Sequence, residues 1–149
     1  IIGFGKKAEV TKIKTRIKKY NLEEIVHNEG LIPYDKLSGF MKKCNIGVSY
    51  VPITPQFDVQ PPTKTIEYLL SGIPTIATAT AENKKIIRNH ENGILINDTS
   101  EGFRKGLEQI MNLEFNNEQI RTKMDQYSWE NIISSNFRPL IKSLLPQDG

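Results

Sequence analysis

Short apolar runs alternate along the chain with longer segments in which apolar residues recur every three or four positions. The short runs predict strands at Ile1–Phe4, Ile25–Asn28, Ile46–Val51, Thr75–Thr78 and Ile94–Ile96. The longer segments predict amphipathic helices, whose apolar faces carry Val10, Ile13, Ile17 and Tyr20, then Leu37, Phe40, Met41 and Cys44, then Ile66, Leu69 and Leu70, and finally Phe103, Leu107, Ile110 and Met111. Strands separated by helices cannot form hairpins, so they imply right-handed crossovers and a parallel sheet. The pattern predicts an α/β fold, a Rossmann-like parallel sheet with helices on both faces.

After Ile96 the strand pattern stops and the remaining residues favour helices. Asp98, Thr99 and Ser100 are good capping residues and predict a helix start. A polar break is expected at Asn112–Asn117, followed by a last helical segment at Tyr127–Leu145. Pro139 interrupts that segment and should kink or split it near Arg138.

The composition is that of a globular chain: 149 residues, 38% hydrophobic and 25% charged, which suits one domain over residues 1–149. No apolar run approaches the roughly 20 residues needed to cross a bilayer. Cys44 is the single cysteine, which excludes an internal disulfide and favours a cytoplasmic location. A net charge of +3 is too small to indicate a nucleic acid partner. Because the chain starts inside an apolar run and without Met, we expect it to be a fragment of a longer protein.

The segment Lys6–Lys19 is strongly basic, with Glu9 as its single acid. Its cations can form a solvated helix face opposite the stripe of Val10, Ile13 and Ile17. A basic amphipathic helix can also lie on an anionic membrane surface. Both interpretations stay open, so peripheral contact with the inner face of a membrane is a second expectation for location.

The most informative stretch runs from Pro61 to Ala77. Prolines suit the first turn of a helix, and Gly72 suits its end. Free N–H groups around Thr63 and Lys64 would hold a diphosphate at the helix N-terminus, aided by the lysine charge. Glu67 lies on the same face one turn later, where a carboxylate can accept two hydrogen bonds from a ribose diol. The alternative is a surface ion pair between Lys64 and Glu67.

A glycine turn at the start of the chain is a second candidate phosphate site. Gly3 and Gly5 follow a predicted strand and precede a predicted helix, where glycines let the backbone approach a phosphate. A full dinucleotide fingerprint needs a third glycine, and Ala8 occupies that position. A simple tight turn is therefore the alternative.

The stretch from Pro62 to Pro74 resembles the donor-binding signature of retaining GT-B glycosyltransferases, the large family related to sucrose and glycogen synthases. The similarity extends to Ile1–Gly5, Glu29–Pro33, Cys44–Ser49, Glu91–Ile96 and the pair Ser128–Trp129. The resemblance implies the C-terminal, nucleotide-sugar-binding half of a GT-B fold. It further implies that Glu67 binds the ribose of a nucleoside diphosphate sugar and that the backbone of Leu31, Ile32 and Pro33 contacts the base.

The sequence departs from the family pattern at two places near the donor sugar. The family's second acid falls at Val59 here, with Asp58 beside it as a candidate replacement, and the Gly-Gly turn is replaced by Ala81-Glu82. The resemblance implies no metal and no cofactor, with the nucleotide sugar as substrate and the acceptor held by a domain outside this chain. No catalytic residue is assigned, and the fragment alone is expected to be inactive. A nucleotide-sugar epimerase of the same fold and a non-catalytic nucleotide-binding module are the alternatives.

Overall fold

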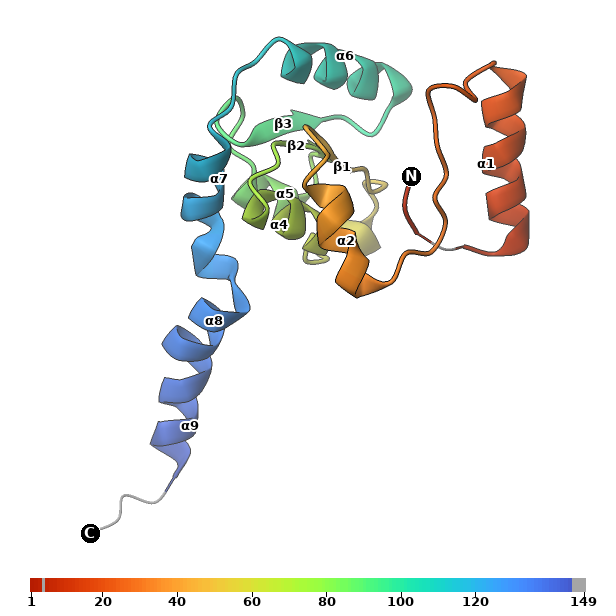
Figure 1. Cartoon of the computed structure of the whole chain (residues 1–149). Helices are drawn as coiled ribbons and strands as arrows, with labels where there is room; N and C mark the ends of the chain where they lie inside the picture. Colours follow the sequence, from red (N-terminus) through yellow and green to blue (C-terminus); the bar gives the residue numbers. More distant parts are fainter. Residues whose placement is uncertain (4, 146–149) are drawn as a thin grey trace. The chain divides into compact units, whose positions relative to one another are not determined.

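The computed structural model describes residues 1–3 and 5–145, which form two compact units (Figure 1). The first unit is Ile1–Lys43, with helices α1 (Lys7–Lys19) and α2 (Tyr34–Met41). The second begins at Cys44 and contains the sheet and the remaining helices. The prediction of one domain over residues 1–149 stays a prediction.

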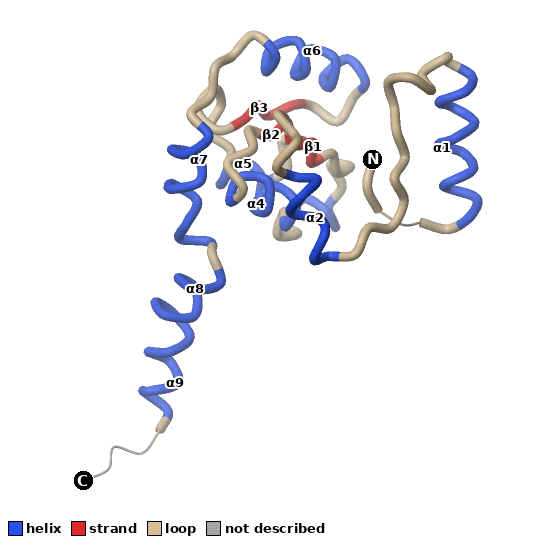
Figure 2. The backbone as a smooth tube through the Cα atoms, viewed as in Figure 1, coloured by secondary structure: helices blue, strands red, loops and turns tan. Residues whose placement is uncertain are grey.

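Three parallel strands form the sheet of the second unit, drawn in red in Figure 2. They are β1 (Gly47–Ser49), β2 (Thr75–Thr78) and β3 (Gly93–Ile96), in the spatial order β1-β2-β3. Helices α3 (Pro55–Asp58) and α4 (Thr63–Leu70) lie between β1 and β2 in the chain, and α5 (Ala81–Ile86) lies between β2 and β3. The three strands predicted within this unit are therefore confirmed, whereas α3 and α5 were not predicted.

Helices cover both faces of this sheet, with α4 and α5 on one side and α6 (Ser100–Met111) on the other (Figure 1). Successive side chains of a strand point to opposite faces, so Ile76 and Ala77 belong to different cores. The first core contains Leu69, Ala77, Ile86, Ile87, Ile120 and Met124, the last two from α7 (Asn117–Met124). The second contains Ile76, Ile94, Ile96 and Ile110. The predicted α/β class, a parallel sheet between helices, is confirmed.

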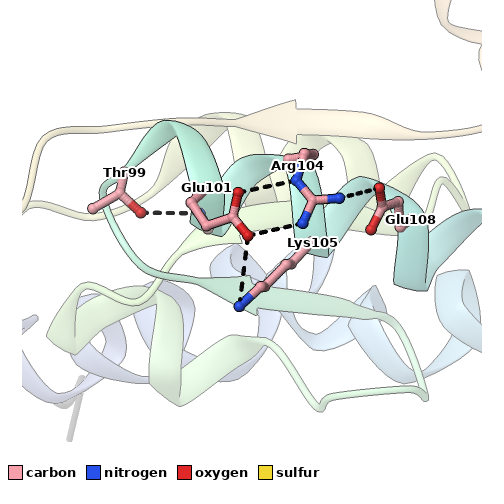
Figure 3. Close-up of polar contacts among 6 residues, drawn as sticks. Thr99, Glu101, Arg104, Lys105 and Glu108 are labelled. Atoms are coloured by element: carbon pink, nitrogen blue, oxygen red, sulfur yellow. Dashed lines mark hydrogen bonds and ion pairs between the residues drawn. The ribbon is translucent and has the colours of Figure 1, made fainter.

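Helix α6 begins where its capping residues predict. The Thr99 hydroxyl accepts a hydrogen bond from the Gly102 N–H at 2.9 Å. On the exposed face, Arg104 bridges Glu101, at 2.8 Å, and Glu108, and Lys105 lies 3.6 Å from Glu101 (Figure 3). The hydrogen bonds that Arg104 donates to Glu101, and then the charge of Glu108, raise the pKa of Arg104 above its ordinary value. The cations of α6 are thus neutralised within their own helix.

The C-terminal segment changes from π-helical to α-helical geometry one residue before its proline. A 3-10 turn (Asp125–Tyr127) leads into α8 (Trp129–Ile132), then a π-helical stretch, η2 (Ile133–Phe137), then α9 (Arg138–Leu144). Pro139 lies in the first turn of α9, directly after the π-helical stretch. Phe137 and Arg138 both keep right-handed helical backbone angles, so the split expected near Arg138 is wrong. The polar break between α6 and α7 is confirmed. Large apolar side chains in this segment are exposed, among them Trp129 at 78% and Leu144 at 72%.

The strands predicted in the first unit are wrong. Residues 23–25 form a turn, and within the described part of Ile1–Phe4 a single bridge links Ile2 to Gly30. Phe4 lies outside the described residues. None of the residues described in this unit is buried, and Ile25 is 73% exposed. A strand is stabilised by partners and by a covered face; here the pairing is limited to a single bridge and no face is covered.

Two predicted apolar stripes are shorter than expected at their C-terminal ends. Tyr20 follows the last residue of α1 and is 61% exposed, while Met111 ends α6 and is 69% exposed. Tyr20 is the C-terminal cap of α1, and Met111 is the last residue of α6.

Gly106 should be indispensable to the packing of α6. A Cβ atom at this position would lie 2.3 Å from Cγ2 of Ile96, well inside van der Waals contact. We expect Gly106→Ala to lower the free energy of unfolding by about 1–3 kcal/mol, measured by urea titration. Gly39→Ala in α2 is the matched control, because an added Cβ there meets nothing within 4 Å. An unchanged stability for Gly106→Ala would contradict this packing.

Candidate functional site

A pocket of about 350 Å³ lies at the carboxyl ends of β1 and β2. Such an edge of a parallel sheet is where open α/β folds bind ligands. We call it the carboxyl-edge pocket; its lining residues are Ser49, Tyr50, Val51, Pro52, Phe57, Gln60, Pro61, Pro62, Thr63, Lys64, Thr80 and Asn83. The irregular stretch between β1 and α4 thus borders the pocket, and it brings Thr63 and Lys64 to the same place.

Helix α4 reaches this pocket with an uncapped N-terminus. Pro62 occupies the cap position and provides no side-chain hydrogen bond. The Thr63 N–H donates to the Pro61 carbonyl at 3.0 Å, so this amide is not free, contrary to the expectation for Thr63. The N–H groups of Lys64 and Thr65 have no acceptor among residues 1–3 and 5–145. The start of α4 therefore offers two amide donors and the Lys64 ammonium to an anion.

The end of α4 shows why its sequence contains a glycine at position 72. Gly72 has φ +75°, a backbone conformation that favours glycine. Its N–H donates to Leu69 at 2.9 Å, and the Ile73 N–H donates to Tyr68 at 2.9 Å. This pair of bonds is a Schellman motif, which ends the helix and turns the chain into β2.

Lys64 and Glu67 lie one turn apart on α4, and both are exposed. No ion pair joins them, and neither side chain has a partner within the part of the chain that the structure describes. The surface ion pair considered as an alternative is therefore not formed. Glu67 is not among the residues lining the pocket, so its carboxylate lies outside the cavity while Lys64 borders it.

Asp58 ties the irregular stretch to the start of α5. Its Oδ1 atom accepts a hydrogen bond from the Ala81 N–H at 2.8 Å, and the side chain is half-buried. The carboxylate thus lies beside the first residue of α5, just beyond the carboxyl end of β2. One of its two oxygens is used by the backbone.

A buried polar network under the pocket was not predicted. The Thr65 hydroxyl lies 2.9 Å from Oγ of Ser49 and 2.8 Å from Oδ1 of Asn83. Asn83 donates from Nδ2 to the Thr78 carbonyl at 2.9 Å. Each of these four residues is at most 1% exposed. The one sequence signal was that Thr65 and Leu69, four residues apart, share the buried face of an amphipathic helix.

The loop that follows β1 is also held by a tyrosine and an aspartate. Tyr50 donates its hydroxyl hydrogen to Oδ1 of Asp98, and the Ile53 N–H donates to Oδ2 at 3.0 Å. The hydrogen bond with Tyr50, and then that with Ile53, lower the pKa of Asp98, while Asp98 raises the pKa of Tyr50. The ring of Tyr50 also meets that of Phe103 edge-on at 6.4 Å. The loop after β1 is therefore fastened to the loop after β3.

The other candidate residues belong to the first unit. The Gly3 N–H donates to the Gly30 carbonyl at 2.8 Å, which places the glycine turn beside the loop of Leu31, Ile32 and Pro33 within that unit. Gly5 precedes α1, and the Lys6 N–H donates to Glu9 at 2.9 Å in a capping box. Gly3, Gly5 and the loop thus form one group, and Thr63, Lys64, Glu67 and Asp58 form another in the second unit.

Residues 1–130 match the sequence profile described as "Glycosyl transferases group 1". The chain belongs to this family. No curated protein matches the sequence. The uncapped start of α4 and its pocket lie at the carboxyl edge of the sheet, the edge at which open α/β folds bind ligands.

Solved glycosyltransferase structures share the fold. A sucrose-phosphate synthase from Thermosynechococcus elongatus matches at TM-score 0.65 with 21% identity over 95% of this chain. The apo form of the lipopolysaccharide outer core galactosyltransferase WaaB matches at 0.66 with 19% identity over 97%. Anabaena Alr3699/HepE in complex with UDP matches at 0.68 with 17% identity over 95%. The present chain spans 38–40% of the length of those proteins.

No group of three or more His, Cys, Asp or Glu side chains among the described residues is arranged to hold a metal ion. None of the helices formed by residues 1–3 and 5–145 combines the length and the apolar character that a membrane span requires.

The contacts of Asp98 predict a pH-dependent stability. Because its pKa is lowered in the folded chain, the ionised carboxylate stabilises the fold above its ordinary pKa, and this contribution is lost as the pH falls through the lowered value. The difference in unfolding free energy between the unmodified chain and Asp98→Asn should be largest at neutral pH and shrink below about pH 4. Urea titrations from pH 7 to pH 3 measure it. Glu114→Gln, an exposed acid, is the control, and a pH-independent difference for Asp98→Asn would contradict the contact.

Proposed function

We propose that this chain is the C-terminal, donor-binding half of a retaining GT-B glycosyltransferase, which moves a sugar from a nucleoside diphosphate sugar to an acceptor. The observation that carries the proposal is the start of α4 at the carboxyl-edge pocket. The unused amide and the ammonium group of Lys64 border the pocket, and the unused amide of Thr65 follows one residue later, in a chain that belongs to a glycosyltransferase family. A diphosphate leaving group needs donors of this kind, already in place, to disperse its negative charge.

Each candidate residue then has a role toward the donor. Lys64 and the first turn of α4, including Thr63, hold the phosphates. Glu67, whose carboxylate has no partner among the described residues, accepts hydrogen bonds from the ribose diol. Asp58 keeps Oδ2 for the donor sugar while Oδ1 holds Ala81.

The first unit supplies the remaining contacts of the donor. The backbone of Leu31, Ile32 and Pro33 faces the base, and Gly3 and Gly5 allow close approach to a phosphate. We assign no catalytic residue to this chain, because the acceptor and the reacting face of the sugar belong to the rest of the protein. The reaction in this proposal uses no metal and no cofactor, since amides and cations stabilise the diphosphate.

The first test is binding of a nucleoside diphosphate by the chain. Calorimetric titration with UDP, GDP, ADP and CDP should find one ligand that binds with a dissociation constant of roughly tens of micromolar to millimolar. We expect this weak affinity because the chain supplies about half of the binding cleft. Glu67→Gln should weaken binding of that ligand about ten- to a hundredfold, because a charge-assisted acceptor is lost. Lys64→Ala should weaken it by an amount that shrinks as salt is added.

The matching 2′,3′-dideoxy nucleotide is the control, because it lacks the diol. Glu67→Gln should then cost almost nothing, since both changes remove the same interaction. Additive losses for the substitution and the dideoxy ligand would remove Glu67 from the site. Absence of binding by all four diphosphates would overturn the proposed function itself.

We also propose that α1 makes a peripheral contact with an anionic membrane. Its segment from Lys6 to Lys19 carries seven cations, and no salt bridge to any of them is found among the described residues, whereas Arg104 and Lys105 of α6 are paired. Unpaired lysines near an anionic surface contribute about 1 kcal/mol each. The exposed side chain of Tyr20 at the end of the helix suits the interface.

Vesicle co-sedimentation measures this contact. The chain should bind vesicles with a third of phosphatidylglycerol and not vesicles of phosphatidylcholine alone, and Lys12→Glu with Lys18→Glu should reduce binding at least tenfold. Lys105→Glu with Lys84→Glu changes the net charge equally at other helices and should leave binding within about twofold. Equal loss in both double variants would reduce the effect to net charge, and preference for an oligonucleotide over the vesicles would exclude the membrane.

A further inference from the structure

The first turn of α4 is held by a side chain inside the helix. A helix normally gains its fixed start from a cap residue that binds the amides of the first turn. Pro62 cannot do this, and the amides of Lys64 and Thr65 have no acceptor in the described chain. Another contact must therefore hold this turn in place.

The hydroxyl group of Thr65 makes this contact. This oxygen is fully buried, 2.9 Å from Oγ of Ser49 at the end of β1 and 2.8 Å from Oδ1 of Asn83 in α5. A hydroxyl has one hydrogen, so Thr65 donates to Asn83 and accepts from Ser49. The first turn of α4 is thereby joined to β1 and to α5 at once.

Asn83 connects this pair to β2 and is itself fixed in place. Its Nδ2 donates to the Thr78 carbonyl at 2.9 Å, and its backbone N–H donates to the Thr80 hydroxyl at 3.2 Å. No buried side-chain nitrogen or oxygen of the described residues lacks a hydrogen-bond partner. A fully satisfied buried network of this kind selects one geometry, because any shift of α4 would leave a buried oxygen unpaired.

We propose that Thr65, with Asn83, is a positioning residue for the anion-binding start of α4. The Thr65 hydroxyl fixes the first turn of the helix at the edge of the sheet. Because the network and not a cap residue holds this turn, its amides keep their direction and stay unused. The Thr65 hydroxyl is engaged by the buried network and the residue does not line the carboxyl-edge pocket, so this side chain acts through the helix and not by touching the ligand. This inference rests on the proposed function, because the anion it serves is the diphosphate.

Thr65→Val tests the proposal, because it keeps the backbone amide and nearly the same shape while removing the hydroxyl. We expect it to weaken binding of the nucleoside diphosphate, measured by calorimetry with the ligand that the unmodified chain binds, about tenfold. Thr65→Ser keeps the oxygen and should bind within about twofold of the unmodified chain. Thr75→Val is the matched control, since Thr75 is equally buried and its hydroxyl bonds to the Ile73 carbonyl, before β2 and outside the pocket lining.

A second measurement needs no ligand and reports the stability of the first turn of α4 separately from nucleotide affinity. The Ile66 N–H, which donates to the Pro62 carbonyl at 3.1 Å, should exchange with solvent faster in Thr65→Val than in Thr75→Val. If Thr65→Val does not fold, Ser49→Ala, which leaves the bond between Thr65 and Asn83 intact, should speed the exchange of the Ile66 N–H by a smaller factor; exchange is the measurement used for this variant because Ser49 lines the pocket.

The outcomes distinguish this inference from the proposed function. Unchanged affinity and unchanged Ile66 exchange in folded Thr65→Val would overturn the positioning role, as would equal losses in Thr75→Val. Absence of nucleotide binding by the unmodified chain would overturn the proposed function, and faster Ile66 exchange in Thr65→Val would then still support the fixing of the helix start by Thr65.

Discussion

The hydroxyl group of Thr65 joins the end of β1, the first turn of α4 and the side chain of Asn83 in the interior of the second unit. Buried polar atoms must find partners, and these atoms find them only when the helix stands in one position against the sheet. The start of α4 that faces the pocket is therefore held by a contact on the buried face of the helix. Loss of the Thr65 hydroxyl would remove a buried partner from both Ser49 and Asn83.

The strands that the sequence predicts correctly pair with a neighbouring strand along their length, and the middle one, β2, is covered on both faces. All four residues of β2 are buried, so the apolar run Thr75–Thr78 and the strand coincide. In the first unit the same kind of run gives different results: Ile25 is 73% exposed, and Ile2 forms one isolated bridge. An apolar run marks a segment able to form a strand, but only neighbouring strands decide whether it does.

The candidate site divides in the same way between local and distant information. Lys64, Glu67 and Gly72 lie within one short motif, where capping and helix periodicity predict their placement on or after one helix. The network that holds that helix joins residues 16 and 18 positions apart in the chain, and no local pattern encodes such a meeting. The prediction of an unused amide at Thr63 was wrong for a related reason, because this N–H donates to the carbonyl of Pro61, two residues earlier in the chain.

The exposure of Trp129 has a consequence for how this protein can be observed. It is the single tryptophan of the chain and is 78% exposed, on the segment that follows α7. Its fluorescence is therefore that of an indole in water even in the folded chain, and the melting of the sheet leaves the emission nearly unchanged. An emission maximum that moves to shorter wavelength would instead report that another surface has covered this segment.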